Sequence, residues 1–97
     1  MKLNVLRKIA IAVVLSSACA LTACKDYVGK EESHALFQKG ESCKNQRKYA
    51  EAVKAYNEFL LICPKSAKTH YKLAEIYKDN LGDPIIAIYH FQKYQEL

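Results

Sequence analysis

The side chains that could carry out catalytic or metal chemistry are few and far apart in this 97-residue sequence. The three histidines, His34, His70 and His90, are isolated from one another. Short metal motifs space their ligands so that they meet, as in His-x-x-x-His or Cys-x-x-Cys, and neither pattern occurs. No glycine-rich phosphate loop or serine elbow is present. We therefore predict that the protein is not an enzyme and has no metal site, cofactor or small-molecule substrate.

One cysteine, Cys24, stands in a context that predicts covalent modification. A basic start (residues 2–8) is followed by an unbroken apolar run (residues 9–15) and then by small residues. Residues 9–23 number only 15, whereas a membrane-spanning helix needs about 20 mostly apolar residues. Residues 1–23 are therefore predicted to be a signal peptide.

The four residues 21–24 read Leu-Thr-Ala-Cys and resemble the lipobox of bacterial lipoproteins. In that family the cysteine sulfur receives a diacylglyceryl group, the signal is cut just before it, and the new amino group is often acylated. The resemblance implies lipidation, with palmitate-type chains, at Cys24, and a tether over residues 24–31. Cys19 is excluded because Ser16 stands where the lipobox has a large aliphatic residue. The alternative is an ordinary signal peptide with Cys24 as an unmodified thiol.

Removal of the signal peptide changes the charge balance. The whole chain has 15 Lys and Arg against 10 Asp and Glu, a net charge of +5. The signal segment holds three basic residues and no acidic one, which leaves 12 against 10, or +2. These charges alternate along the chain and lack the clustered basic stripe that nucleic-acid binding requires. The composition therefore excludes a nucleic-acid partner.

From residue 31 onward the sequence is helix-forming, with no alternating strand pattern, and it predicts an all-α fold. Asn45 is expected to end the first helix because asparagine tolerates a left-handed cap. Ser66 and Asp83 are suited to N-capping, and Pro84 to a first helical turn. The four predicted helices run over about 31–44, 47–62, 66–79 and 84–97.

The second pair of helices repeats the first. Gly40 and Ala74 lie 34 residues apart, and Ala52 and Ala87 lie 35 apart. The same offsets relate three larger pairs, Leu36 with His70, Cys43 with Tyr77, and Tyr56 with Phe91.

This pattern resembles the tetratricopeptide repeat: a period of 34, a small residue late in the first helix, an Ala-x-x-x-aromatic pair in the second and a closing proline. The resemblance implies a short α-solenoid, with repeat 1 at 32–64 and repeat 2 at 65–97, without a capping helix. Lys39 and Cys43 depart from the leucine and tyrosine that the family prefers. The matching residues are Gly40, Ala52, Tyr56, Pro64, Leu73, Ala74, Tyr77, Ala87 and Phe91.

Cys43 and Cys63 remain as candidates for a disulfide in an exported protein. Antiparallel helices would place Cys63 beside the start of the first helix, about ten residues before Cys43. At 1.5 Å per residue this is roughly 15 Å, beyond the approximately 7 Å limit between bridged Cα atoms. We predict no disulfide between them.

Two surfaces are candidates for protein binding. The recognition surface of the family is the concave face of the first helices, and the resemblance places Phe37, Glu41, Lys68, Tyr71 and Lys72 on it. Some relatives bind a C-terminal carboxylate with lysine and asparagine side chains of these helices. In this sequence Phe37 and Glu41 stand at the expected lysine and asparagine positions, so the resemblance does not imply carboxylate binding. The alternative is a solvated face with incidental aromatics.

The second surface is the last helix, which is apolar around much of its circumference. Ile86 and Tyr89 occupy positions where the first repeat has Glu51 and Lys54. A helix of this kind is normally covered, so we expect contact with a second copy or a partner protein. The alternative is marginal exposure at a frayed terminus or in a truncated reading frame.

Together these features predict a lipid-anchored module for protein–protein interaction in the bacterial cell envelope. Lys25 favours the outer membrane, because aspartate at that position retains lipoproteins in the inner membrane in enteric-type sorting. Two alternatives remain: a subunit or pilotin-like assembly factor of an envelope machine, and a secreted protein without lipid.

Overall fold

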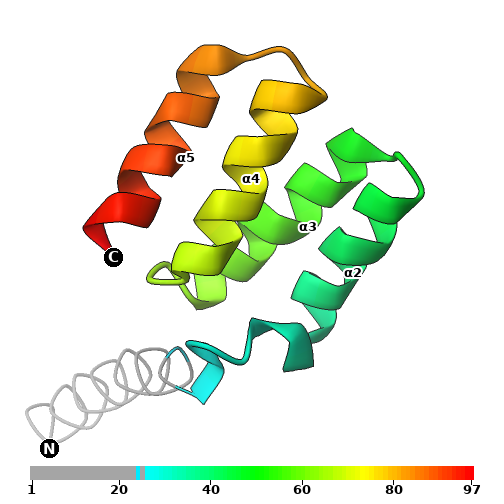
Figure 1. Cartoon of the computed structure of the whole chain (residues 1–97). Helices are drawn as coiled ribbons and strands as arrows, with labels where there is room; N and C mark the ends of the chain where they lie inside the picture. Colours follow the sequence, from blue (N-terminus) through cyan, green and yellow to red (C-terminus); the bar gives the residue numbers. More distant parts are fainter. Residues whose placement is uncertain (1–23, 25) are drawn as a thin grey trace, which may run out of the picture.

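The computed structural model describes residues 24 and 26–97 (Figure 1). The predicted signal peptide, residues 1–23, and Lys25 lie outside this part of the chain. Among the described residues every regular element is helical, which confirms the predicted all-α class. The elements are the 3-10 turn η1 (Glu31–Ser33) and the helices α2 (Ala35–Asn45), α3 (Tyr49–Ile62), α4 (Ala67–Asp79) and α5 (Pro84–Glu96).

The four helices form two hairpins that stand side by side. α2 packs on α3, α4 packs on α5, and α4 also contacts α3. Figure 1 shows them in a row, with α2 at one end and α5 at the other. This is the predicted short solenoid of two helix pairs. Residues 35–62 are called unit one below, and residues 67–96 are called unit two.

Two predicted helix starts are confirmed by their capping bonds. The Ser66 hydroxyl accepts a hydrogen bond from the Thr69 N–H at 3.3 Å. The Asp83 carboxylate accepts one from the Ile86 N–H at 3.2 Å, and Pro84 is the first residue of α5. Each cap satisfies a backbone donor that has no partner inside its helix. The two helices of unit two, α4 and α5, therefore begin directly after the polar capping residues that the sequence analysis identified.

The first helix begins later than predicted. Residues 31–33 form the separate turn η1, and His34 has an extended backbone with φ −90° and ψ 135°. His34 Nδ1 accepts a hydrogen bond from the Leu36 N–H at 3.1 Å, which makes His34 the N-cap of α2. Histidine is not among the residues that usually mark an N-cap. This boundary therefore has no clear signal in the sequence.

The turn between α2 and α3 also differs from the prediction. Asn45 is still helical, and the left-handed residue is Arg47, with φ 60°. The Arg47 N–H donates to the Lys44 carbonyl at 2.9 Å, and the Lys48 N–H donates to the Cys43 carbonyl at 2.8 Å. These two bonds are the pattern of a Schellman cap, in which glycine usually holds the left-handed position. Because arginine occupies the left-handed position, the residue type at this position does not predict the turn.

The segment expected to be a tether packs on unit one. The Tyr27 ring lies edge-on to His34, at 4.9 Å between centroids, and 6.4 Å from Phe59. Cys24 and Glu31 are buried. The described residues of the predicted tether, 24 and 26–31, are therefore attached to the fold by aromatic and polar contacts.

Candidate protein-interaction surfaces

The first predicted surface, on α2 and α4, loses its central aromatic residue to the core. Phe37 is only 1% exposed. Its ring packs edge-on against Tyr56 at 5.4 Å and Phe59 at 5.9 Å between centroids. A side chain enclosed in this way by α3 offers almost no surface to a partner. The assignment of Phe37 to a recognition face is therefore wrong.

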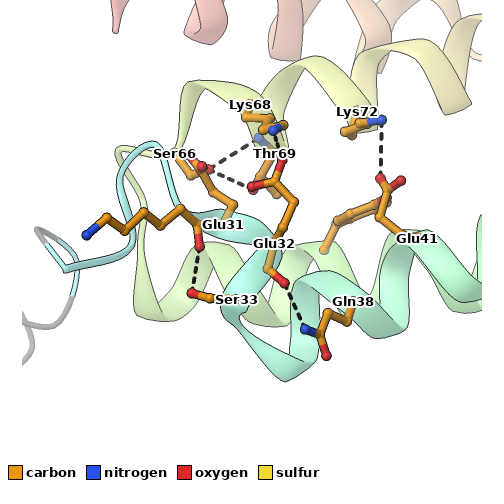
Figure 2. A network of polar contacts seen from close by, with 11 residues as sticks. Glu31, Glu32, Ser33, Gln38, Glu41, Ser66, Lys68, Thr69 and Lys72 are labelled. Carbon is orange, nitrogen blue, oxygen red and sulfur yellow. Dashed lines mark hydrogen bonds and ion pairs between the residues drawn. The ribbon is translucent and has the colours of Figure 1, made fainter.

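The charged residues of this surface pair with one another across the two units. Lys72 Nζ lies 3.3 Å from a Glu41 oxygen, and Lys68 forms an ion pair with Glu32 just before α2 (Figure 2). A third pair, Lys44 with Glu75 at 3.8 Å, continues the row. All six side chains are partly exposed, so each pair contributes at most about 1 kcal/mol. The row mainly fixes how α4 lies on unit one.

Glu41 has a second structural role. Its carboxylate accepts a hydrogen bond from the hydroxyl of Tyr56, a side chain that is otherwise fully buried. Burial, and then this hydrogen bond to a carboxylate, raise the pKa of Tyr56 far above its usual value. Glu41 is thus already engaged by Tyr56 and Lys72.

A buried polar cluster joins η1 to the start of α4, and sequence reasoning missed it. Glu31 is 3% exposed, and one of its oxygens accepts a hydrogen bond from the Ser66 hydroxyl at 3.1 Å. The Ser66 and Thr69 hydroxyl oxygens are 2.7 Å apart, so Thr69 donates to Ser66 (Figure 2). The second Glu31 oxygen has no hydrogen-bond partner among the described residues. No local spacing predicts contacts between residues 35 positions apart.

Tyr71 remains exposed, as predicted, and has aromatic neighbours on α5. Its ring centroid lies 5.9 Å from that of Phe91 and 5.2 Å from that of Tyr94. Both contacts lie within unit two, so they brace α4 against α5. Of the five residues predicted for the first surface, Phe37 is buried, and Glu41, Lys68 and Lys72 form ion pairs within the chain. Tyr71 is the one that is exposed and not engaged in an ion pair.

The second predicted surface, on α5, is an apolar face that no other helix of the described residues covers. Ile85, Ile88 and Tyr89 are 79%, 56% and 52% exposed, and Ile86 is at the margin of exposure. These residues recur three and four positions apart, so they share the outer side of the helix. The contacts of α5 are made chiefly with α4, on the opposite side. Isolated surface hydrophobics are ordinary, but a contiguous stripe marks a contact surface.

A groove borders this stripe and contains both residues predicted there. Its volume is about 620 Å³, and α3 and α5 supply most of its lining. Ile86 and Tyr89 line it from α5, and Leu60 and Leu61 from α3. The apolar surface therefore continues from the outer side of α5 onto the end of α3.

Two buried histidines, His70 and His90, also line the groove. Their Nδ1 atoms are 3.0 Å apart, and His70 Nε2 lies 3.3 Å from the Pro64 carbonyl oxygen. A carbonyl only accepts, so His70 is protonated on Nε2 and its Nδ1 accepts from His90 Nδ1–H. Burial lowers the pKa of both rings, that of His90 to about 4. Each histidine looks isolated in the sequence, and only the packing of α5 on α4 brings them together.

The cysteines among the described residues, Cys24, Cys43 and Cys63, are buried free thiols. Cys43 lies in the core, and the Cys63 sulfur lies 3.5 Å from the Cys24 carbonyl oxygen. Burial, followed by the neighbouring Cys24 thiol, raises the pKa of Cys63 to about 12. Cys63 is therefore a protonated, unreactive thiol near neutral pH. Cys24, the predicted lipidation site, packs at the end of α3.

The remaining chemistry of the described residues is sparse. No group of three or more His, Cys, Asp or Glu in residues 24 and 26–97 is arranged to hold a metal ion. In the same part of the chain, no helix combines the length and hydropathy needed to cross a membrane.

Comparison with known proteins agrees with the architecture of unit one. Residues 33–66 match the family model of the tetratricopeptide repeat. Such repeats generally mediate protein–protein interaction and are typically non-catalytic. No curated protein and no solved structure matched the chain. A tetratricopeptide repeat is thus present over 33–66, and unit two has the same helix-pair arrangement.

Proposed function

We propose that this chain is a lipid-anchored protein-interaction module of the bacterial cell envelope, and that the outer side of α5 is its contact surface. The observation that carries the proposal is the exposed stripe of Ile85, Ile88 and Tyr89 beside the α3–α5 groove. A contiguous apolar patch that faces water in the single chain marks a contact surface, and aromatic side chains are enriched in protein interfaces.

The internal repeat supports a role beyond folding for this surface. Unit one has the same helix pair, yet it carries Glu51 and Lys54 where unit two carries Ile86 and Tyr89. Both residues of unit one are exposed. The scaffold therefore tolerates charge at these positions. Tyr89 has contacts within the chain, with the His90 ring at 5.0 Å between centroids and with Lys93 Nζ at 5.8 Å from its own ring centroid. A partner that covers Ile86 and Tyr89 together would account for both apolar residues.

The anchor in this proposal is Cys24. Acylation of its sulfur requires the thiol to be accessible, whereas Cys24 in the described chain is buried against Cys63. We infer that lipidation releases this turn from the end of α3. Tyr27 would still hold the following residues on Phe59 of unit one, and Glu31 would hold them on Ser66 at the start of α4. The module would then lie close to the membrane, with Lys25 favouring the outer membrane and its periplasmic side.

A permanent subunit or assembly factor of an envelope machine is the second candidate. The extent of the apolar stripe on α5 favours it over a transient adaptor, because obligate interfaces are the more hydrophobic ones. One stoichiometric partner that survives extraction in detergent would mark such a subunit.

A crosslinking pull-down from native membranes tests the proposed contact surface. The full chain is compared with an Ile86→Glu/Tyr89→Lys variant, which carries the residues of unit one at these positions. We expect the wild type to capture protein and the variant to lose it, with the helical content unchanged. Equal capture by both chains would overturn the assignment to α5.

The anchor needs a separate measurement. The intact mass of the membrane-extracted chain should exceed that of the polypeptide from Cys24 onward by several hundred daltons. A Cys24→Ser variant should lack this addition and should leave the membrane fraction. An unmodified mass would instead favour the secreted, non-lipidated protein.

A further inference from the structure

We propose that one end of the solenoid binds a phospholipid surface and buries Val28 and Leu61 in its headgroup region. The residues of this end are 24, 26–30 and 61–66, and they are called the anchored end below. The inference rests on the proposed function, because it names the part of the fold that meets the membrane to which Cys24 is attached. It depends on the reach of the anchor, the apolar side chains at this end and the charges beside them.

Two segments that are distant in sequence meet at the anchored end. The Cys24 carbonyl oxygen accepts a hydrogen bond from the Val28 N–H at 3.2 Å and lies 3.5 Å from the Cys63 sulfur. Figure 1 shows the start of the described chain at the same end of the molecule as the connection between α3 and α4. The turns inside the two units, residues 46–48 and 80–83, lie at the opposite end (Figure 1).

The anchor keeps this end close to the membrane. Tyr27 follows Cys24 by three residues, and its ring packs on His34 and Phe59. An extended chain spans about 3.5 Å per residue, so a lipid on Cys24 leaves Tyr27 within about 10 Å of the bilayer. The 14 residues of α3 span about 21 Å, so the far end of this helix lies beyond that reach when the solenoid stands upright. The anchored end is therefore the part of the fold that the bilayer meets.

Exposed apolar side chains lie at the anchored end. Leu61, in the last turn of α3, is 86% exposed, the largest value for any large hydrophobic residue that the structure describes. Val28 is 53% exposed, and Pro64 is exposed as well. The equivalent of Leu61 in unit two, 35 residues later, is Glu96, so the repeat itself does not require leucine at this position. A membrane interface beside Cys24 would bury these apolar side chains.

The charges of the anchored end fit an anionic lipid surface. Lys30 and Lys65 are exposed, and neither takes part in an ion pair among the described residues. Asp26 is the one carboxylate of this end. Long lysine side chains keep their ammonium groups in the headgroup region while neighbouring apolar residues insert more deeply. The two lysines are thus suited to phosphate-bearing headgroups around the inserted residues.

The test uses tryptophan fluorescence, because the chain contains no tryptophan and a single introduced one reports only its own surroundings. Leu61→Trp and Val28→Trp report on the anchored end. Leu81→Trp is the matched control, since Leu81 is also an exposed leucine, 42% exposed, but lies in the turn between α4 and α5. Each full, membrane-extracted chain is reconstituted into vesicles of phosphatidylethanolamine and phosphatidylglycerol, with and without bromine on the acyl chains. We expect bromine to remove most of the emission at positions 61 and 28 and little at position 81.

Vesicle flotation and intact mass separate this inference from the anchor. A chain that carries lipid and floats, but is quenched no more at positions 61 and 28 than at position 81, overturns the inference and leaves the anchor standing. Ile88→Trp tests whether α5 lies flat on the membrane: quenching there as strong as at position 61 also overturns the inference. A chain that carries no lipid and does not float refutes both proposals. Circular dichroism should show the same helical content in all four variants.

Discussion

The Tyr56 ring lies so close to Gly40 that a Cβ built on the glycine would be 2.6 Å from Tyr56 Cε1. The ring has no room to withdraw, because Tyr56 is fully buried and its hydroxyl is bonded to Glu41. Gly40 thus sets the distance between α2 and α3. Its role is close approach and not a special backbone angle, since it lies inside α2.

This contact predicts that Gly40→Ala destabilises the protein. Alanine favours a helix by about 1 kcal/mol over glycine, but overpacking of a filled core costs about 1–3 kcal/mol. We expect a net loss of about 1 kcal/mol in the free energy of unfolding, measured by urea titration followed by circular dichroism. A Gly40→Ala chain as stable as the wild type would contradict the close packing.

The left-handed residue Arg47 predicts a stabilising substitution. Left-handed backbone costs a residue with a Cβ about 1 kcal/mol, and glycine avoids this cost at a Schellman cap. Arg47→Gly should therefore raise the free energy of unfolding by up to about 1 kcal/mol. Part of the gain is offset by the greater freedom of glycine in the unfolded chain.

Gly82 supplies the converse control, because it has φ 64° and open space around its Cβ position. Gly82→Ala should lower stability through backbone strain alone, by about 1 kcal/mol. If both substitutions shift the urea midpoint in the same direction, the proposed role of backbone angle at Arg47 is wrong.

The His70–His90 pair predicts acid sensitivity. The pKa values of both rings are lowered from 6.5 by burial, so the unfolded chain binds protons that the folded chain does not. The contribution of each ring to stability is complete above pH 6.5 and is lost as the pH falls below that value, for His90 down to its folded-state pKa of about 4. For His90, with a pKa of about 4, the loss approaches roughly 3 kcal/mol at the acid end.

Unfolding in urea at pH 7.5 and at pH 5 measures this dependence. His90→Gln removes one titrating ring and should flatten the pH dependence, although it also lowers stability at pH 7.5. Lys93→Gln should also reduce the acid sensitivity slightly, because the charge of Lys93 lowers the pKa of His70. A pH profile identical to wild type in His90→Gln would show that another group is responsible.

The Glu31–Ser66 contact predicts energetic coupling between two residues that flank unit one in the sequence. Ser66→Ala removes both the N-cap of α4 and the only hydrogen bond to the Glu31 carboxylate among the described residues. We expect a loss of about 2 kcal/mol, since each of these effects is worth about 1 kcal/mol.

A double-mutant cycle separates the two effects. Glu31→Gln in the Ser66→Ala background should cost less than Glu31→Gln alone, because the hydrogen bond is already absent. Additive losses in urea unfolding would mean that Glu31 and Ser66 do not interact in solution.

The fold was predictable from the sequence because its signals are local. Ser66, Asp83 and Pro84 mark helix starts through capping chemistry, and the spacing of Gly40, Ala52 and Tyr56 marks a repeat. The boundaries at His34 and Arg47 were not predictable, because each residue has a role that its type does not favour. A histidine cap and a left-handed arginine depend on the bonds around them.

The candidate site was predictable only in part. Ile86 and Tyr89 stood out because the second unit could be compared with the first, position by position. Phe37 was misplaced, because a family position does not reveal that this aromatic side chain turns into the core against Tyr56. The histidine pair and the Glu31–Ser66 contact lie 20 and 35 residues apart in sequence and depend on tertiary packing.

The central claim is that the outer side of α5 contacts protein, and photo-crosslinking from single positions in the native membrane tests it most directly. A benzoylphenylalanine in place of Tyr89 reports on this surface, and one in place of Lys54 reports on the equivalent exposed position of unit one. The account predicts abundant protein adducts from position 89 and few from position 54. Equal yields from the two positions, or adducts from position 54 alone, would contradict it.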